Sequence, residues 1–245
     1  MINTDKDIKR CPRCSMRLSL CLCNLLKPLT LKTEIQIVMH HRETKLYSNS
    51  ARLAHLMLKN SRVFIRGREE GEPLTPLALE MGTEQFSKAA LSSERENLVL
   101  FPSETSVELS DEIVRSFKKP ITLIVPDGSW RQAARIPKRE PALQGLKHVK
   151  LPPGPPSNYR LRREHHPHYI CTFEAISRAL AILEGPQTAR ELDAIFEVMV
   201  ERVLWSRSHI KPEQCKHPIP AEALHEWKVA GFAPDKRPKF EPGGS

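Results

Sequence analysis

Glycine is scarce in this chain of 245 residues, which has 10 glycines against 21 prolines. That balance favours stiff, extended loops over flexible linkers. The sequence contains no G-x-G-x-x-G segment after a strand-like run and no G-x-x-x-x-G-K-[ST] segment. These two absences exclude the Rossmann dinucleotide fingerprint and the P-loop.

Long apolar runs are also missing, because no stretch approaches the roughly 18 consecutive apolar residues that a membrane-spanning helix needs. The first residues, MINTDKDIKR, contain no apolar core of a secretory signal. We therefore expect a cytoplasmic protein whose cysteines stay reduced. Together these absences exclude the membrane, collagen-like and disulfide-scaffold classes.

Hydrophobic residues and positive charge are plentiful. Hydrophobic residues make up 40% of the chain, and 38 Lys and Arg against 29 Asp and Glu give a net charge of +9. The hydrophobic fraction suffices for a sizeable core, and the length suits one or two domains. The positive excess favours a polyanionic partner such as nucleic acid or an anionic membrane surface.

Strand-like and helix-like segments alternate from residue 31 to about residue 209. Apolar periodicity predicts strands at 33–39, 62–66, 97–101 and 121–125, the last two ended by Pro102 and Pro126. It predicts helices after an N-cap at 48–50, and at 110–117, 172–183 and 191–205. This alternation predicts an α/β fold with a mainly parallel sheet. Beyond it we expect an extended or partly disordered tail.

Four of the six cysteines lie within thirteen residues near the N-terminus. Cys11, Cys14, Cys21 and Cys23 follow the spacing C-x2-C-x6-C-x-C. Structural zinc takes four thiolates in a tetrahedron, and two short cysteine pairs can supply them. We therefore predict a structural Zn²⁺ site. The weaker alternatives are an apolar segment with incidental cysteines, a disulfide pair and an iron–sulfur cluster.

A second candidate site follows the predicted strand at 121–125, where the sequence reads Pro126-Asp127-Gly128-Ser129-Trp130. Ligands of open α/β sheets bind beyond the carboxyl ends of strands. There Asp127 can accept or position a proton, and Trp130 can stack on a base or line an apolar pocket. Gly128 allows a close turn around a ligand.

Basic residues follow this motif, with Arg131 and Arg135 one turn apart on one helical face. Pro137 is expected to end or kink that helix. The alternative interpretation is purely structural: Asp127 or Ser129 is an N-cap, Trp130 is a core residue, and the arginines form a solvated face. The residues alone leave both interpretations open.

Five blocks, in order along the chain, resemble the motifs of the DTW-domain family, which is named for its D-x-[TS]-W signature. The blocks are His41-Arg42-Glu43 with Asn49-Ser50-Ala51-Arg52-Leu53-Ala54, Leu100-Phe101-Pro102-Ser103, Pro126-Asp127-Gly128-Ser129-Trp130, Tyr159-Arg160-Leu161-Arg162, and Cys171-Thr172-Phe173-Glu174-Ala175. Two positions depart from the usual pattern: Ser129 replaces Thr, and Cys171 stands where Ser is common. Neither departure removes the carboxylate or the tryptophan.

The resemblance implies a tRNA-uridine aminocarboxypropyltransferase of the bacterial branch, which acts on the tRNA variable loop. Such an enzyme moves the 3-amino-3-carboxypropyl group of S-adenosyl-L-methionine to N3 of a uridine and releases methylthioadenosine. The implied fold is SPOUT-like: a mainly parallel sheet flanked by helices, with a C-terminal trefoil knot. We divide the chain into a four-cysteine zinc-binding module (1–28), a DTW catalytic domain (29–209) and a basic, proline-rich tail (210–245).

Motif positions also imply the roles of individual residues. The expected catalytic residues are Asp127, Ser129 and Trp130. The expected cofactor-binding residues are Leu100, Pro102, Ser103, Val125, Pro126, Gly128, Arg52, Tyr169 and Thr172. The expected tRNA contacts are Arg131, Arg135, Arg160, Arg162 and Arg163, and Arg52, Arg160 and Arg162 are also candidates for the carboxylate of the transferred group.

Several alternatives stay open. The same cofactor supports methyl transfer in SPOUT relatives, and a non-catalytic, zinc-bearing tRNA-binding protein would use Asp127 and Trp130 structurally. We interpret His165, His166 and His168 as a surface loop or a substrate contact and not as a metal site. Partners other than tRNA are not implied, and the sequence does not distinguish a monomer from a homodimer.

Overall fold

The structure, a computed structural model, describes residues 8–161 and 169–230 apart from positions 69, 70, 72, 74, 76, 77 and 80–83. Within these residues, six parallel strands form one sheet in the order β2-β1-β5-β3-β6-β4. The strands are β1 (Glu34–His40), β2 (Ser61–Arg66), β3 (Glu96–Leu100), β4 (Val107–Glu108), β5 (Ile121–Asp127) and β6 (Lys147–Lys150). The helices are α1 (Ser50–Met57), α3 (Asp111–Ser116), α4 (Trp130–Arg139), α5 (Thr172–Leu183), α6 (Pro186–Ser206) and α7 (Ala221–Ala230).

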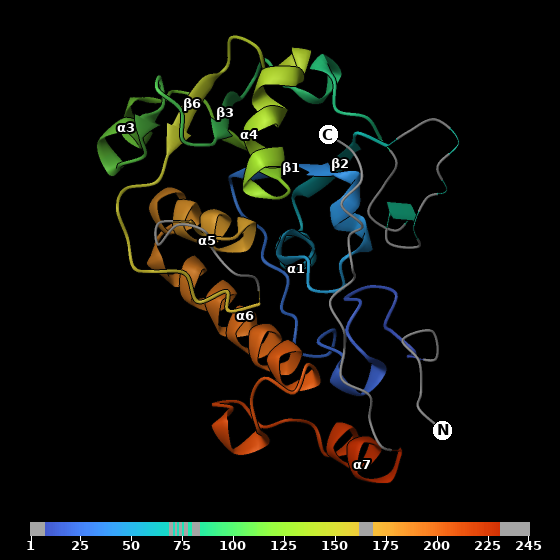
Figure 1. The fold of residues 1–245 in the computed structure, drawn as a ribbon. Helices are drawn as coiled ribbons and strands as arrows, with labels where there is room; N and C mark the ends of the chain where they lie inside the picture. The colour runs from blue at the N-terminus through green and yellow to red at the C-terminus, as the bar shows by residue number, and fades with distance from the viewer. Residues whose placement is uncertain are drawn as a thin grey trace.

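Helices cover both faces of the sheet (Figure 1). Ile37 and Met39 of β1 point into the larger core, together with α1, α5 and α6. Val38, between them, points into a smaller core that contains Ile136 of α4. Burial on both faces explains why the strands are nearly continuous apolar runs. The predicted α/β architecture with a parallel sheet flanked by helices is therefore confirmed.

The predicted helix starts are found where side chains cap the first turn. Asn49 accepts a hydrogen bond from the Arg52 backbone N–H (2.8 Å) at the start of α1. Ser110 accepts one from Ile113 at the start of α3. Helix α5 has the predicted bounds, and α6 begins five residues earlier than the predicted 191, at Pro186. Pro at the first position of a helix costs no hydrogen bond, because that N–H has no intrahelical partner.

The predicted end of the central strand is wrong. β5 continues through Pro126 to Asp127, paired with Val38 and Met39 of β1. The pairing of β3 with β5 ends at Ile124. Beyond that point β5 has β1 as its one paired neighbour, which is the edge-like situation where a sheet tolerates proline.

Two further expectations need correction. Pro137 does not end α4, which continues two residues beyond it to Arg139, and a kink at this proline stays a prediction. The tail at 210–245 is not extended throughout, because residues 221–230 form α7. Trp227 of α7 packs edge-on against Trp205 of α6, with ring centroids 5.2 Å apart. Glu226 accepts a hydrogen bond from the Ser19 hydroxyl (2.7 Å).

The cysteine-rich N-terminal segment packs on the same core as the sheet. Met16 and Leu20 are fully or almost fully buried within that core. The Arg202 guanidinium of α6 donates to the backbone carbonyls of Leu20 (3.0 Å) and Cys21 (2.7 Å). The long α6 helix therefore fixes the cysteine segment in place.

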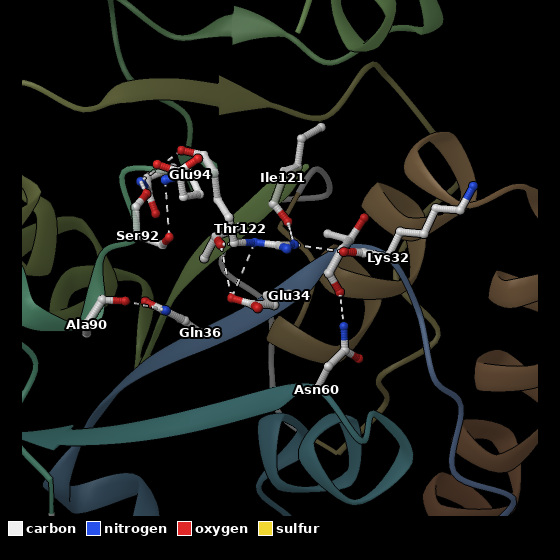
Figure 2. Close-up of polar contacts among 12 residues, drawn as sticks. Lys32, Glu34, Gln36, Asn60, Ala90, Ser92, Glu94, Ile121 and Thr122 are labelled. Carbon is white, nitrogen blue, oxygen red and sulfur yellow. Dashed lines mark hydrogen bonds and ion pairs between the residues drawn. The ribbon is translucent and has the colours of Figure 1, made fainter. Parts of the chain in front are cut away.

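The amino edge of the sheet is organised around Arg95, whose partners are labelled in Figure 2: Lys32, Glu34, Ile121 and Thr122. Its guanidinium donates to the Thr122 hydroxyl (2.8 Å) and to the carbonyls of Lys32 (2.7 Å) and Ile121 (2.6 Å). It also pairs with the Glu34 carboxylate at 3.4 Å. One side chain therefore joins the starts of β1 and β5.

None of the helices in the described ranges has the length and apolar character needed to span a bilayer.

Candidate functional site

A cavity of about 1000 Å³ lies at the carboxyl edge of the sheet. Its walls come from the ends of β3 and β5, the start of α4, the segment at 151–155 after β6, and one face of α5. Such a volume suits a cofactor-sized ligand. The predicted site residues that line it are Leu100, Pro102, Val125, Pro126, Asp127, Gly128, Ser129, Trp130, Arg131, Tyr169 and Thr172.

Four of the residues predicted for the site lie elsewhere in the structure. Arg52 is 2% exposed and donates to the Leu46 carbonyl (3.4 Å) instead of lining the cavity. Ser103, Arg135 and Arg160 are exposed and also lie outside the cavity lining. The remaining predicted residues, Arg162, Arg163, His165, His166 and His168, fall outside the described residues.

The Asp127 carboxylate lies in the cavity wall and is 3% exposed. One oxygen accepts a hydrogen bond from the Thr172 hydroxyl (2.6 Å), and the other accepts one from the Asn49 amide (3.0 Å). Thr172 is the first residue of α5, and Asn49 is the N-cap of α1. The starts of two helices therefore fix the orientation of this carboxylate.

Asn49 also connects Asp127 to a second buried carboxylate. Its amide nitrogen donates to Glu43 (3.1 Å), and its carbonyl oxygen accepts from the Arg52 backbone. Glu43 is 4% exposed and lines the same cavity. Glu43 and Asn49 are not among the residues predicted for the site. Both fall in the quoted blocks, but their separation from Asp127 along the chain hides the contact.

Ser129 is the N-cap of α4. Its hydroxyl accepts from the Gln132 backbone N–H (3.3 Å), and the Gln132 side chain accepts from the Ser129 backbone N–H (2.9 Å). This is a reciprocal capping box. A Cβ at Gly128 would lie 2.9 Å from the Gln132 Cβ. Glycine at this position therefore leaves the room that the capping side chain of Gln132 occupies.

Trp130 forms an aromatic wall of the cavity. Its ring stacks on Tyr169, with centroids 3.9 Å apart and planes at 18°, and it lies 6.0 Å from the Phe101 ring. All three residues line the cavity and are half-buried. Trp130 is therefore a cavity residue and not a core residue. Its ring presents a flat apolar surface to a ligand in the cavity.

His40 supports the site from the end of β1. Its Nδ1 accepts from the Arg42 backbone N–H (3.2 Å) and lies 3.4 Å from the Gln132 amide nitrogen. Burial, together with the charges of His41 and Arg42, lowers the pKa of His40 to about 4. The imidazole is therefore neutral at physiological pH and acts as a hydrogen-bond acceptor for this corner of the site.

The sulfurs of Cys11, Cys14, Cys21 and Cys23 all lie within 4.8 Å of one another. The pairs Cys11–Cys23 and Cys14–Cys21 are each separated by 3.6 Å. Burial, the largest effect, and the neighbouring thiols raise the pKa of Cys14 to about 11. Four converging sulfurs are compatible with metal binding.

A sequence model described as "DTW domain" matches residues 8–204. The chain belongs to the DTW domain family. The match runs from the cysteine segment to the end of α6 and so includes both candidate sites. The DTW motif itself, at 127–130, forms the corner where β5, α4 and the cavity meet.

Two curated relatives of this DTW-domain chain are both named "tRNA-uridine aminocarboxypropyltransferase 2". The Macaca fascicularis protein is 29% identical over 71% of this chain and 56% of its own length. The Drosophila melanogaster protein is 28% identical over 74% of this chain and 69% of its own length. The chain thus spans little more than half of the macaque relative.

Among solved structures, the SAM-dependent rRNA:acp-transferase Tsr3 from Vulcanisaeta distributa overlaps with a TM-score of 0.41 at 12% identity. The overlap covers 81% of this chain and 90% of that protein.

Proposed function

We propose that this DTW-domain protein transfers the 3-amino-3-carboxypropyl group of S-adenosyl-L-methionine to N3 of a tRNA uridine and releases methylthioadenosine. The names of the curated relatives support this activity. The observation that carries it is the Asp127 carboxylate, which two hydrogen bonds hold in the wall of a cofactor-sized cavity.

The reaction needs a proton acceptor and a defined geometry. Uridine N3–H is a weak acid and must lose its proton as N3 attacks carbon, and we assign the acceptance of that proton to Asp127. The new N–C bond replaces the C–S bond, whose electron pair stays on sulfur as a neutral thioether. Because the sulfonium is already an activated leaving group, the main task of the protein is positioning.

The rest of the cavity is suited to the two substrates. Leu100, Pro102, Val125 and Pro126 supply an apolar surface for the adenosine part of the cofactor. Trp130 and Tyr169 offer a flat face against which a base can stack. Gly128 and Ser129 shape the turn between Asp127 and Trp130.

Basic residues beside the cavity would bind tRNA phosphates. Arg131 lies in the cavity wall, and Arg135 is exposed one turn further along α4. Arg160 is exposed, and Arg162 and Arg163 remain sequence-based candidates. Each substitution to Gln that removes a phosphate contact should shallow the log–log salt dependence of tRNA binding by about 0.7 to 0.9. Unchanged slopes would remove these arginines from the interface.

We further propose that the cysteine cluster holds a structural Zn²⁺ within an N-terminal module at 1–28, ahead of the catalytic domain at 29–209 and the tail at 210–245. With Zn–S bonds of about 2.3 Å, tetrahedral ligands lie about 3.8 Å apart. The two 3.6 Å sulfur pairs agree with this spacing.

Elemental analysis of the purified full chain tests the metal. We expect one zinc per chain, lost in Cys14→Ser and retained in Cys215→Ser, a matched change outside the cluster. Iron in place of zinc, or metal retained by Cys14→Ser, would contradict the assignment.

Mass spectrometry of tRNA nucleosides and of the spent cofactor tests the activity. The full chain, incubated with unmodified tRNA and S-adenosyl-L-methionine, should yield aminocarboxypropyluridine and methylthioadenosine in equal amounts. Methylated nucleosides with S-adenosylhomocysteine would establish methyl transfer instead. Binding of tRNA with both masses unchanged would establish a non-catalytic RNA-binding protein.

A further inference from the structure

Among the described residues, three basic side chains line the cavity, and each has a different environment. Arg131 is exposed in the first turn of α4. Lys150 of β6 lies opposite Glu108 of β4 in the strand register, and both line the cavity. Arg178 of α5 is half-buried in the cavity wall. None of the three is among the residues predicted to bind the carboxylate of the transferred group.

Arg178 lies on the one face of α5 that borders the cavity. The cavity-lining residues of this helix and its cap are Cys171, Thr172, Ala175 and Arg178, and each is less buried than its neighbours at 173–174 and 176–177. Thr172, at the start of this face, donates to Asp127. The same face thus carries a partner of Asp127 at one end and a guanidinium at the other.

The guanidinium of Arg178 rests against the proline-rich segment after β6. Its Nη2 donates to the Pro156 carbonyl in a long hydrogen bond of 3.4 Å. A Cβ at Gly154 would lie 3.0 Å from its Nη1, so the glycine leaves room for the group. Among the described residues no carboxylate oxygen lies within ion-pair distance of Arg178.

Asp193 of α6 is an acidic residue that interacts electrostatically with Arg178 without a direct ion pair. Burial raises the pKa of Asp193, while the Ser177 hydroxyl, which donates to it (2.7 Å), and the Arg178 charge act in the opposite direction. Within the described part of the chain, Asp193 thus lies near Arg178 without forming an ion pair with it.

The length of the transferred group fits this placement. Its carboxyl carbon lies three bonds, about 4 Å, from the carbon that N3 attacks. Thr172 and Arg178 are six residues apart, which is about 9 Å along a helix, and helical side chains lean towards the N-terminus. A substrate carbon near Asp127 therefore brings its carboxylate within reach of Arg178. A guanidinium binds such a carboxylate in a two-pronged contact.

We infer that Arg178 binds the carboxylate of the methionine end of S-adenosyl-L-methionine and thereby makes the cavity selective for a cofactor that carries this carboxylate. This inference rests on the proposed function, because S-adenosyl-L-methionine is the cofactor of that function. Arg52 and Arg160, the described residues first considered for this role, do not line the cavity.

Equilibrium binding by calorimetry tests this assignment with three ligands: S-adenosyl-L-methionine, its decarboxylated analogue and methylthioadenosine. The full chain with Arg178→Gln should bind S-adenosyl-L-methionine roughly 10- to 100-fold more weakly. Its affinity for the two ligands without the carboxylate should stay within about 3-fold of the wild type. Arg178→Lys should recover part of the loss, because it restores the charge without the fork.

Two control variants separate recognition from support of the proline-rich segment. Glu174→Gln weakens the contacts that Glu174 makes with the Ser157 hydroxyl (2.6 Å) and the Asn158 backbone (2.7 Å), so it should affect all three ligands alike. Arg190→Gln removes an exposed arginine of α6 that pairs with Gln187 and should change none.

The outcomes are distinct. Equal weakening of all three ligands by Arg178→Gln, or no change for any, would overturn the role of Arg178 while leaving the proposed function intact. A wild-type chain that binds none of the three ligands would overturn the proposed function and the inference together.

Discussion

The two edges of the sheet are both rich in polar side chains, but they use them differently. At the amino edge, Arg95 joins the starts of two strands through hydrogen bonds to Thr122, Lys32 and Ile121 (Figure 2). At the carboxyl edge, Asp127 receives two hydrogen bonds and still borders a cavity of about 1000 Å³. The first arrangement is suited to stability, and the second to binding and chemistry.

The contrast follows from what the surrounding segments do. At the amino edge, short connections place backbone carbonyls next to the Arg95 guanidinium. The guanidinium donates hydrogen bonds to these carbonyls. At the carboxyl edge, helix starts and the proline-rich segment border the strand ends and form walls. Buried polar groups are therefore a sign of function where they face a cavity, and a sign of structure where they face one another.

The largest expected effect is that of Asp127→Asn, which keeps the shape of the side chain and removes the proton acceptor. The single-turnover transfer rate should fall by at least about 100-fold. The urea midpoint should change little, because the amide can retain one of the two hydrogen bonds. Quenched-flow assays with labelled cofactor give the rate. Undiminished turnover would remove Asp127 from the mechanism.

The matched change at the other edge is Arg95→Met. It removes the donors for Thr122, Lys32 and Ile121, and the free energy of unfolding should fall by about 2 to 3 kcal/mol. The transfer rate per folded molecule should stay within a factor of about 3, because the group is remote from the chemistry. Urea denaturation and the same transfer assay give both numbers. A lower transfer rate with an unchanged free energy of unfolding would contradict a stabilising role for the amino edge.

Asn49→Ser separates the two roles of a residue that belongs to both structure and site. Serine keeps an oxygen that caps α1 but loses the amide that donates to Asp127 and Glu43. We expect a transfer rate lower by about 10-fold and a stability loss of about 1 kcal/mol. Ser110→Ala, at the cap of α3, should cost about the same stability with a normal rate. Equal rates in the two variants would contradict a positioning role.

A further expected effect concerns pH. The pKa of His40 is about 4 in the folded chain against an ordinary value of 6.5. As the pH falls, His40 therefore binds a proton in the unfolded chain before it does so in the folded chain. The contribution of His40 to the free energy of unfolding is fully present above pH 6.5 and is lost as the pH falls towards 4. Between pH 7 and 5 the wild type should lose about 1 to 2 kcal/mol more than His40→Gln. Equal losses in urea titrations at both pH values would contradict the shifted pKa.

Sequence periodicity predicted the central elements well, because their burial is continuous. β1, β5 and α5 are long and apolar, and their patterns leave little choice of structure. β6 was missed because one residue of its four, Val149, is buried. α7 was missed because prolines and basic residues hid the helical spacing of Ala223, Leu224 and Trp227.

The candidate site was only partly predictable for a different reason. The DTW motif is contiguous, so Asp127 and Trp130 could be found together. The contacts of Asp127 with Asn49 and Thr172 cross the fold, and no local pattern reveals them. The spacing of basic residues likewise does not tell that Arg52 is buried while Arg178 borders the cavity. The trefoil knot implied by the resemblance stays a prediction.

Hydrogen-exchange mass spectrometry of the full chain, with and without S-adenosyl-L-methionine, tests whether the cofactor binds at the carboxyl edge of the sheet. We expect the cofactor to protect backbone amides there, in peptides covering 100–103, 126–132 and 169–178. Peptides covering the amino edge at 92–97 should exchange at unchanged rates. Protection at the amino edge, or none at the carboxyl edge under saturating cofactor, would contradict the account.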